Sequence, residues 1–137
     1  GSGILAIAAL ALGASAAVGV DIDPKAADVA FENAALNGVG PDRLAVLAGD
    51  VLSDRTLAAR LGPGRNRVVL ANIVADVIIP LSGMVGALMA QDGAFLTSGI
   101  IDGRQDEVGA ALGENGFAVI RHRARSGWHA FLAKKRE

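Results

Sequence analysis

Cysteine and tyrosine are absent from this 137-residue sequence, and only five residues are Phe or Trp. Without cysteine the chain cannot form disulfides, thiolate metal sites or a cysteine nucleophile. The two histidines, His122 and His129, are too few for a histidine-rich site, so no catalytic metal is expected. Neither histidine has an identifiable Ser, Asp or Glu partner in the sequence, and a hydrolytic triad is therefore not expected.

The sequence also lacks a strong net charge, because 13 Lys and Arg stand against 14 Asp and Glu. A chain with mixed charges and a formal net charge of −1 gives no global reason to expect a polyanionic partner. One basic run lies near the end of the chain, made of Arg121, His122, Arg123, Arg125, Lys134, Lys135 and Arg136. Such a run is typical of a solvated strand face and tail, with an RNA-facing role as the less favoured alternative. No direct nucleic-acid partner is expected.

Charged side chains are missing from residues 1–20, which is nearly a membrane-spanning length. The stretch is mostly Ala and Gly, which gain little from lipid, and Gly13 and Ser15 interrupt it. It also lacks the basic residues that begin a signal peptide. A membrane or signal segment is therefore the minor alternative. We expect a cytoplasmic protein without a membrane partner, which the absence of cysteine weakly favours.

Predicted strands and helices alternate along most of the chain. The strands are expected at 16–20, 44–48, 68–71, 94–98, 117–123 and 128–134, and the helices at 4–12, 24–36, 54–61, 76–90 and 104–114. This order predicts an α/β fold in one domain over residues 1–137, a three-layer, doubly wound, Rossmann-like and mostly parallel sheet. The last two strands, joined by residues 124–127, should form an antiparallel hairpin at one edge.

Three residues give further expectations about where these elements begin and how they pack. Asp23 is expected to cap the helix that follows it, with Pro24 in its first turn. Pro80 should start or kink the helix at 76–90, since proline cannot donate the helical hydrogen bond. Trp128, at the start of the last strand, is expected to be an edge core residue.

A glycine turn, Gly1-Ser2-Gly3, precedes the first helix, and Asp21 follows the first expected strand. With Ala6 the turn fits the pattern G-x-G-x-x-G/A of dinucleotide sites. A carboxylate at that strand end can accept hydrogen bonds from both ribose hydroxyls of an adenosine, which serves NAD and S-adenosylmethionine equally. The alternatives are a tight turn without a ligand and a solvated strand end. Because the chain begins at the turn, we expect the first strand of the sheet to be missing.

Polar residues also follow two later strands. Asp50 could meet an adenine amino group or simply form a turn, and the two alternatives are balanced. Asn72 directly follows the strand at 68–71, at the sheet edge where open α/β folds place their active sites. Its amide oxygen can accept a hydrogen bond from an amine and direct the amine lone pair at an electrophile; the alternative is a helix cap. Ser98-Gly99 is expected to form a turn rather than to line the pocket.

Several segments together resemble one family, the bacterial ribosomal protein L11 methyltransferases, known as the PrmA family. The segments are Gly1-Ser2-Gly3-Ile4-Leu5-Ala6-Ile7-Ala8-Ala9-Leu10, Gly19-Val20-Asp21-Ile22-Asp23-Pro24, Glu32-Asn33-Ala34, Leu36-Asn37-Gly38-Val39, Ala71-Asn72-Ile73-Val74-Ala75-Asp76, Leu96-Thr97-Ser98-Gly99-Ile100, and Gly116-Phe117 before the strand that contains Trp128. The first segment is shared by many methyltransferases. Its combination with the segments around Asn72 and Ser98 is much more specific.

The resemblance implies a class I methyltransferase that uses S-adenosyl-L-methionine to methylate lysine side chains and the N-terminal amine of a large-subunit ribosomal protein. It implies cofactor contacts at Asp21 and Asn72, and Gly1 and Gly3 match its glycine motif. With Ile22 and Asp50 these residues make up the expected cofactor site, and Asn72 is also the expected catalytic residue. The alternatives are an NAD-dependent oxidoreductase domain, which lacks a placed hydride-transfer partner, and an inactive methyltransferase fragment.

Three departures from the family pattern bear on activity. The first strand with its aspartate and leading glycine, an upstream threonine contact and the amino-terminal recognition domain have no counterpart here. Because the absence of a central strand leaves unpaired ladder groups, the isolated chain is expected to methylate poorly or not at all.

Overall fold

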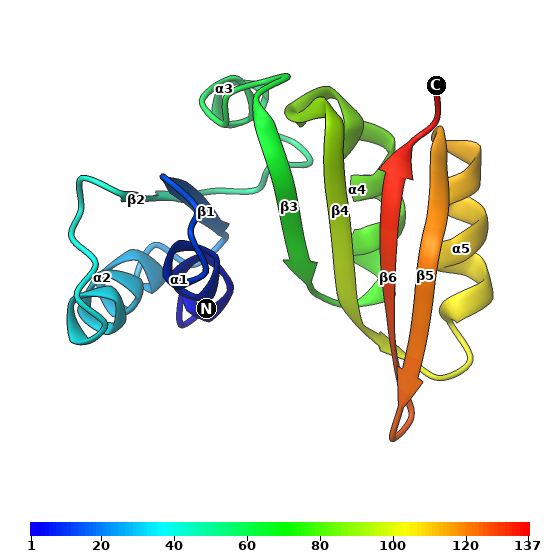
Figure 1. The fold of residues 1–137 in the computed structure, drawn as a ribbon, viewed down its shortest axis with the longest axis horizontal. Helices are drawn as coiled ribbons and strands as arrows, with labels where there is room; N and C mark the ends of the chain where they lie inside the picture. Colours follow the sequence, from blue (N-terminus) through cyan, green and yellow to red (C-terminus); the bar gives the residue numbers. More distant parts are fainter. The chain divides into compact units, whose positions relative to one another are not determined.

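The structure is a computed structural model that describes residues 1–137. It divides into two compact units, Gly1–Leu61 and Gly62–Glu137, each with its own sheet and helices (Figure 1). The first sheet contains β1 and β2, and the second has the strand order β3-β4-β6-β5. The predicted mixed α/β fold is confirmed, whereas a single domain over both units stays a prediction.

The first unit contains three helices and two parallel strands. Their bounds are α1 Ile4–Ala11, β1 Ala17–Asp21, α2 Ala26–Leu36, β2 Leu44–Ala48 and α3 Arg55–Ala59. The strands pair in register from Ala17 with Leu44 to Asp21 with Ala48, so both carboxyl ends lie at the same edge. Ile7 and Leu10 of α1 pack with Ala34 and Leu44 in the core of this unit.

The carboxyl end of α1 is closed by a residue far away in the sequence. Arg43 donates from its guanidinium to the carbonyl of Ala14 at 2.9 Å and to that of Leu10 at 3.4 Å. The Leu10 carbonyl also accepts the backbone N–H of Gly13 at 3.2 Å, so Arg43 is a second donor there and the side-chain donor to the Ala14 carbonyl after the helix. Gly13 follows the helix with φ +115°, in agreement with the predicted helix end.

The start of α2 differs from the prediction. The regular helix begins at Ala26, two residues later than predicted, after a turn at residues 23–25. In that turn the Asp23 carboxylate accepts the backbone N–H of Lys25 at 2.9 Å, which is the contact that a capping Asp makes with the residues after it. The predicted end at Asn37-Gly38 is confirmed, with Gly38 at φ +72°.

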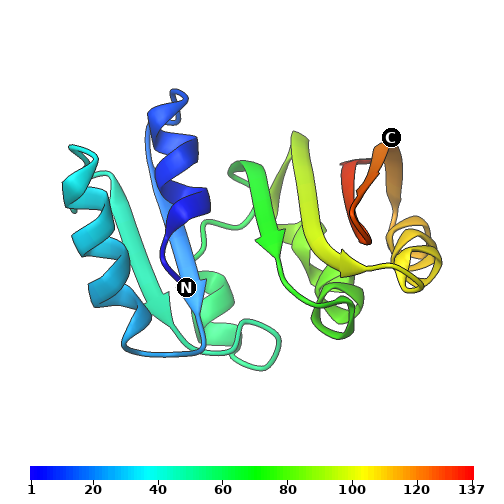
Figure 2. The same ribbon diagram turned by 90° about the horizontal axis from the view of Figure 1, so that it is seen from below.

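The second unit contains two helices and four strands. Their bounds are β3 Asn66–Asn72, α4 Ala75–Leu88, β4 Met89–Ile101, α5 Gln105–Glu114, β5 Phe117–Arg125 and β6 Trp128–Lys135. Strands β3 and β4 are parallel, and β6 is antiparallel to both of its neighbours. Both helices lie on one face of this sheet (Figure 2). Between sheet and helices the rings of Phe95 and Phe117 lie 5.7 Å apart, both fully buried.

The closing hairpin lies at the sheet edge, as predicted. Its second strand, β6, pairs with β4, so the outermost strand is β5. The turn is shorter than the predicted 124–127: Ser126 and Gly127 both have positive φ, +54° and +81°, as a two-residue hairpin turn requires. Trp128 is 54% exposed, so its prediction as a core residue is wrong.

Helix α4 contains Pro80 in its interior. The prediction that Pro80 starts this helix is wrong, because the helix begins five residues earlier, after the extended residue Val74. Ile78, Leu81 and Val85 on this helix are buried, and their packing stabilises the helix despite the missing proline N–H. None of the helices is both long and apolar enough to span a membrane.

Arg104 joins the starts of the two helices in this unit. It bonds Glu107 of α5 and Asp76 of α4, each at 2.7 Å. The hydrogen bonds that Arg104 donates to Glu107 and, second in size, to Asp76 raise the pKa of Arg104 above its ordinary value, so this guanidinium stays charged.

Candidate functional site

Gly3 forms the tightest part of the glycine turn. It is the residue before α1 and has φ +81°, a conformation that favours glycine. A Cβ atom at Gly3 would lie 2.8 Å from the Cβ of Ala30 and 3.2 Å from its Cα. Only a glycine therefore allows the turn to pack directly on α2. The first backbone amides of α1 lie beside this turn, and free amides at the N-terminus of a helix can bind negative or polar groups.

Asn33 of α2 fixes the same turn from the other side. Its amide Nδ2 donates to the carbonyl of Ser2 at 2.9 Å, across 31 positions of sequence. The interpretation of the sequence missed this role. The signal in the sequence is a polar residue three positions after Ala30, next to the series of small residues Ala26, Ala30 and Ala34 that the helix buries.

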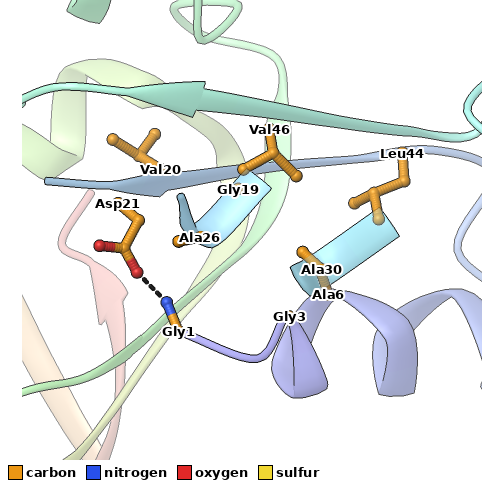
Figure 3. Close-up of a pocket in the computed structure, with 10 residues that line it drawn as sticks. All are labelled: Gly1, Gly3, Ala6, Gly19, Val20, Asp21, Ala26, Ala30, Leu44 and Val46. Atoms are coloured by element: carbon orange, nitrogen blue, oxygen red, sulfur yellow. Dashed lines mark hydrogen bonds and ion pairs between the residues drawn. The ribbon is translucent and has the colours of Figure 1, made fainter. Parts of the chain in front are cut away.

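Asp21 and the glycine turn come together, as the sequence predicts. One carboxylate oxygen of Asp21 accepts the N–H of Asp23 at 2.9 Å, and the other contacts the amino group of Gly1 (Figure 3). The Asp21 side chain is 24% exposed. A carboxylate has about four lone-pair positions, so Asp21 keeps acceptor capacity for a further ligand.

A small cavity of about 70 Å³ lies between the turn and β1. Gly1, Gly3 and Asp21 border it, with Gly19 and Val46 on the strands behind (Figure 3). Typical small-molecule sites enclose roughly 300–1,000 Å³, so this cavity suits one part of a larger ligand. The absence of a side chain at Gly19 keeps the strand surface open at this point.

Asp50 and Ile22 lie at the same edge of the first sheet. The N–H of Gly49 donates to the carbonyl of Asp21 at 2.9 Å, which keeps the two strand ends side by side. The Asp50 carboxylate accepts the N–H of Leu52 at 3.0 Å, so the turn-forming alternative is present in the structure. Ile22 follows Asp21 and is 74% exposed. The ligand roles of both residues stay predictions.

Asn72 belongs to the second unit, at the carboxyl end of β3 and paired in register with Ser98. Its exposed side chain has no hydrogen-bond partner, and the residue before α4 is Val74, so the capping alternative is wrong. A Cβ at Gly99 would lie 2.5 Å from the Asn72 Oδ1. Gly99 therefore leaves room for the amide, which remains free to bind another molecule.

Ser98 and Gly99 form an irregularity inside β4, where the register shifts between Thr97 and Ile100. The expectation of a turn is therefore wrong, since the strand continues to Ile101. Gly99 has φ +78°, which suits a bulge that carries a glycine.

The two histidines form a chain of hydrogen bonds with an acid. His129 contacts Asp102 at 2.8 Å through Nε2 and His122 at 2.7 Å through Nδ1, and the His122 ring stacks on Phe131 with centroids 4.4 Å apart. The prediction that neither histidine has an acidic partner is wrong. Asp102 lies 27 positions before His129, and the sheet register brings them together. No serine bonds either ring, so the hydrolytic triad remains unsupported.

Comparison with known proteins identifies the family. The sequence profile of the family described as ribosomal protein L11 methyltransferase (PrmA) matches residues 1–136. The chain belongs to this family. A ribosomal protein L11 methyltransferase of Desulfitobacterium hafniense is 44% identical to it, over 98% of this chain and 40% of the relative. The chain thus spans about two fifths of the length of such curated relatives.

Solved structures show the same relationship. The ribosomal protein L11 methylase of Lactobacillus delbrueckii subsp. bulgaricus superposes with a TM-score of 0.87 at 31% identity, over 100% of this chain and 66% of that one. SMU.776, a putative methyltransferase complexed with SAH, reaches a TM-score of 0.80 at 10% identity, over 97% and 42% of the two chains, and shows the fold alone. These findings confirm the expected family and do not favour an NAD-dependent oxidoreductase.

Proposed function

We propose that this chain forms the cofactor-binding and catalytic part of an S-adenosylmethionine-dependent methyltransferase that acts on amines of ribosomal protein L11. The observation that carries the proposal is the cavity that the Gly1–Gly3 turn and the Asp21 carboxylate line together. Family membership over residues 1–136 supports the same reaction class. The solved relative that contains SAH, the demethylated cofactor, supports the choice of cofactor.

The residues of the first unit fit an adenosine-bearing cofactor. The left-handed Gly3 and the first turn of α1 let a ligand approach the backbone closely, since no side chain intervenes. Asp21 would accept hydrogen bonds from ribose hydroxyls with its remaining acceptor capacity. Ile22 would contact the base with its exposed side chain, and Asp50 would accept from the adenine amino group.

S-adenosylmethionine, when bound, supplies a methyl group on a positively charged sulfur, which an amine attacks by direct displacement. The protein then has to present a neutral amine in line with that bond. A free lysine amine has a pKa of about 10.4, so it must lose its proton before it attacks. The free Asn72 amide oxygen would accept a hydrogen bond from the amine and orient its lone pair.

The finer part of the proposal concerns the substrate. We assign lysine side chains and the N-terminal amine of ribosomal protein L11 as acceptors, because family membership indicates this protein and its amines are the groups that suit displacement. A cytoplasmic location accompanies a ribosomal protein substrate.

Calorimetric titration of the chain with S-adenosylhomocysteine and with NADH tests the cofactor. We expect S-adenosylhomocysteine to bind more tightly, and a preference for NADH would contradict the proposal.

Methylation of L11 by the protein as its gene encodes it tests the role of Asn72. Asn72→Ala should lower kcat by roughly 10²-fold with a smaller change in cofactor affinity. An unchanged kcat would exclude Asn72 from the chemistry.

A further inference from the structure

Charge is divided unequally along this nearly neutral chain. Residues 117–137 contain six Lys and Arg and one acid, Glu137, whereas residues 1–116 contain seven Lys and Arg and 13 acids. The closing hairpin and tail therefore carry a formal charge of +5, and the rest of the chain carries −6. An overall charge near zero hides a basic segment of the size that attracts polyanions.

Three arginines of this segment lie on one face of the outermost strand. Arg121, Arg123 and Arg125 alternate along β5, opposite Leu132, Ala130 and Trp128 of β6. Alternate residues of a strand point to the same face about 6.7 Å apart, so the three form a row roughly 13 Å long. All three are exposed, and none of their side chains forms an ion pair or hydrogen bond within the chain.

This row faces away from the helices of its unit. Phe131 of β6 is 5% exposed, and Gly109 of α5 lies against its ring, so α5 covers the sheet face that carries Phe131. Phe131 pairs with His122 of β5, which therefore lies on the same face. The three arginines alternate with His122 along β5 and lie on the opposite face. The row is at the edge of the sheet in Figure 1, where β5 has β6 on one side only.

An exposed aromatic residue continues the row. Trp128 is the only tryptophan of the chain, is 54% exposed, and stands opposite Arg125 beside the tight Ser126-Gly127 turn. A large aromatic ring at such exposure loses apolar contact with the protein and offers a flat surface to a partner. The two-residue turn fixes the backbone positions from which the ring and the arginines project.

We propose that this hairpin face, made of Arg121, Arg123, Arg125 and Trp128, binds single-stranded RNA. A row of cations beside an exposed ring is the combination by which proteins hold single strands: cations contact phosphates, and the ring stacks on a base. Arginine suits this purpose because its planar guanidinium bonds phosphate in a bidentate way. An acidic peptide would use the charges but would leave Trp128 without a stacking partner.

Fluorescence anisotropy with a labelled 20-nucleotide oligouridine tests the arginine row. The variant with Arg121, Arg123 and Arg125 changed to Gln is compared with a control in which Arg55, Arg60 and Arg65, which are also exposed, are changed to Gln. Both variants lose three charges. We expect the hairpin variant to bind about tenfold more weakly at low salt and the control to change less than about twofold. The salt slope of log affinity should fall by about 2 in the hairpin variant, since each phosphate contact on a single strand contributes roughly 0.7.

Variants of Trp128 test whether the partner is RNA or another polyanion. Trp128→Ala should weaken oligouridine binding about tenfold, and Trp128→Phe should restore most of it, because base stacking on an aromatic ring is lost and regained. A polyglutamate peptide of equal charge should compete poorly. Equal losses in the two triple variants, no effect of Trp128→Ala, or equal competition by polyglutamate would each overturn the proposal. RNA binding by this face does not require the cofactor. A chain that fails to bind S-adenosylhomocysteine should therefore still give these RNA results, so failure of the proposed function and failure of the RNA proposal can be told apart.

Discussion

Single residues decide the geometry of the glycine turn. Gly3 has to be glycine for two reasons, its left-handed backbone and its contact with Ala30, and Asn33 holds the carbonyl of Ser2. These contacts lie within one unit and link α1 to α2. The consequence is that the turn depends on neighbours about 30 residues away, so small changes on α2 should affect cofactor binding.

Gly3→Ala should lower the free energy of unfolding by about 2–3 kcal/mol, because it combines backbone strain with overpacking against Ala30. Gly38→Ala is the matched control: Gly38 has a similar φ of +72° and no atom within 4 Å of an added Cβ. It should cost only the strain, about 1 kcal/mol. Urea denaturation of both variants measures the difference. Equal losses would show that the contact with Ala30 contributes nothing.

Asn33→Ala should weaken binding of S-adenosylhomocysteine about fivefold, since a hydrogen bond of this kind contributes about 1 kcal/mol to holding the turn. Asn37→Ala is the control, because the Asn37 amide donates only to the carbonyl of Asn33 within the same helix. Titration calorimetry measures both affinities. If the two variants bind alike, Asn33 does not position the turn.

At the scale of elements, local patterns predicted most of what the structure contains. Strand β2 coincides with the prediction, and α1 ends just before Gly13 as expected, because hydrophobic runs and glycine act locally. The regular part of α2 begins two residues later than predicted, since residues 23–25 form a turn first. The bulge at Ser98-Gly99 and the exposure of Trp128 depend on sheet register, which no local pattern shows.

The candidate functional site also combines contacts that the local sequence predicts with contacts that only the tertiary structure shows. The meeting of Gly1 with Asp21 was predictable, because a turn and the neighbouring strand end form one supersecondary unit. The contact of Asn33 with Ser2 and that of His129 with Asp102 span 31 and 27 positions, and only tertiary packing brings them together.

Helix α1 provides a prediction at this scale. Arg43→Met keeps the aliphatic length of the side chain but removes its donors to the carbonyls of Leu10 and Ala14. We expect the free energy of unfolding to fall by about 1–2 kcal/mol, because the Ala14 carbonyl loses its side-chain donor and the Leu10 carbonyl keeps only the N–H of Gly13. Arg55→Met, at an exposed position without a hydrogen bond, should change it by less than about 0.5 kcal/mol. Chemical denaturation measures both variants, and equal losses of unfolding free energy in Arg43→Met and Arg55→Met would contradict the role of Arg43.

At the scale of the whole molecule, ligand binding should be visible as stability. A ligand that binds only the folded chain stabilises it by about 2.7 kcal/mol at a concentration of 100 times Kd. For a chain of this size that shift is about 10 °C in Tm. S-adenosylhomocysteine should produce it in thermal unfolding, and NADH at the same concentration should not.

Two carboxylates of the first unit should respond differently in that experiment. Asp21→Asn should remove most of the shift, because a neutral amide is a weaker acceptor for two ribose hydroxyls than a carboxylate. Asp50→Asn should keep most of it, since an amide oxygen can still accept the N–H of Leu52 and an adenine amino group. Because both variants remove one negative charge, a general electrostatic effect would lower the two shifts alike. The unequal response would therefore identify Asp21 as the residue that holds the ribose, and a full shift in Asp21→Asn would contradict the proposed site.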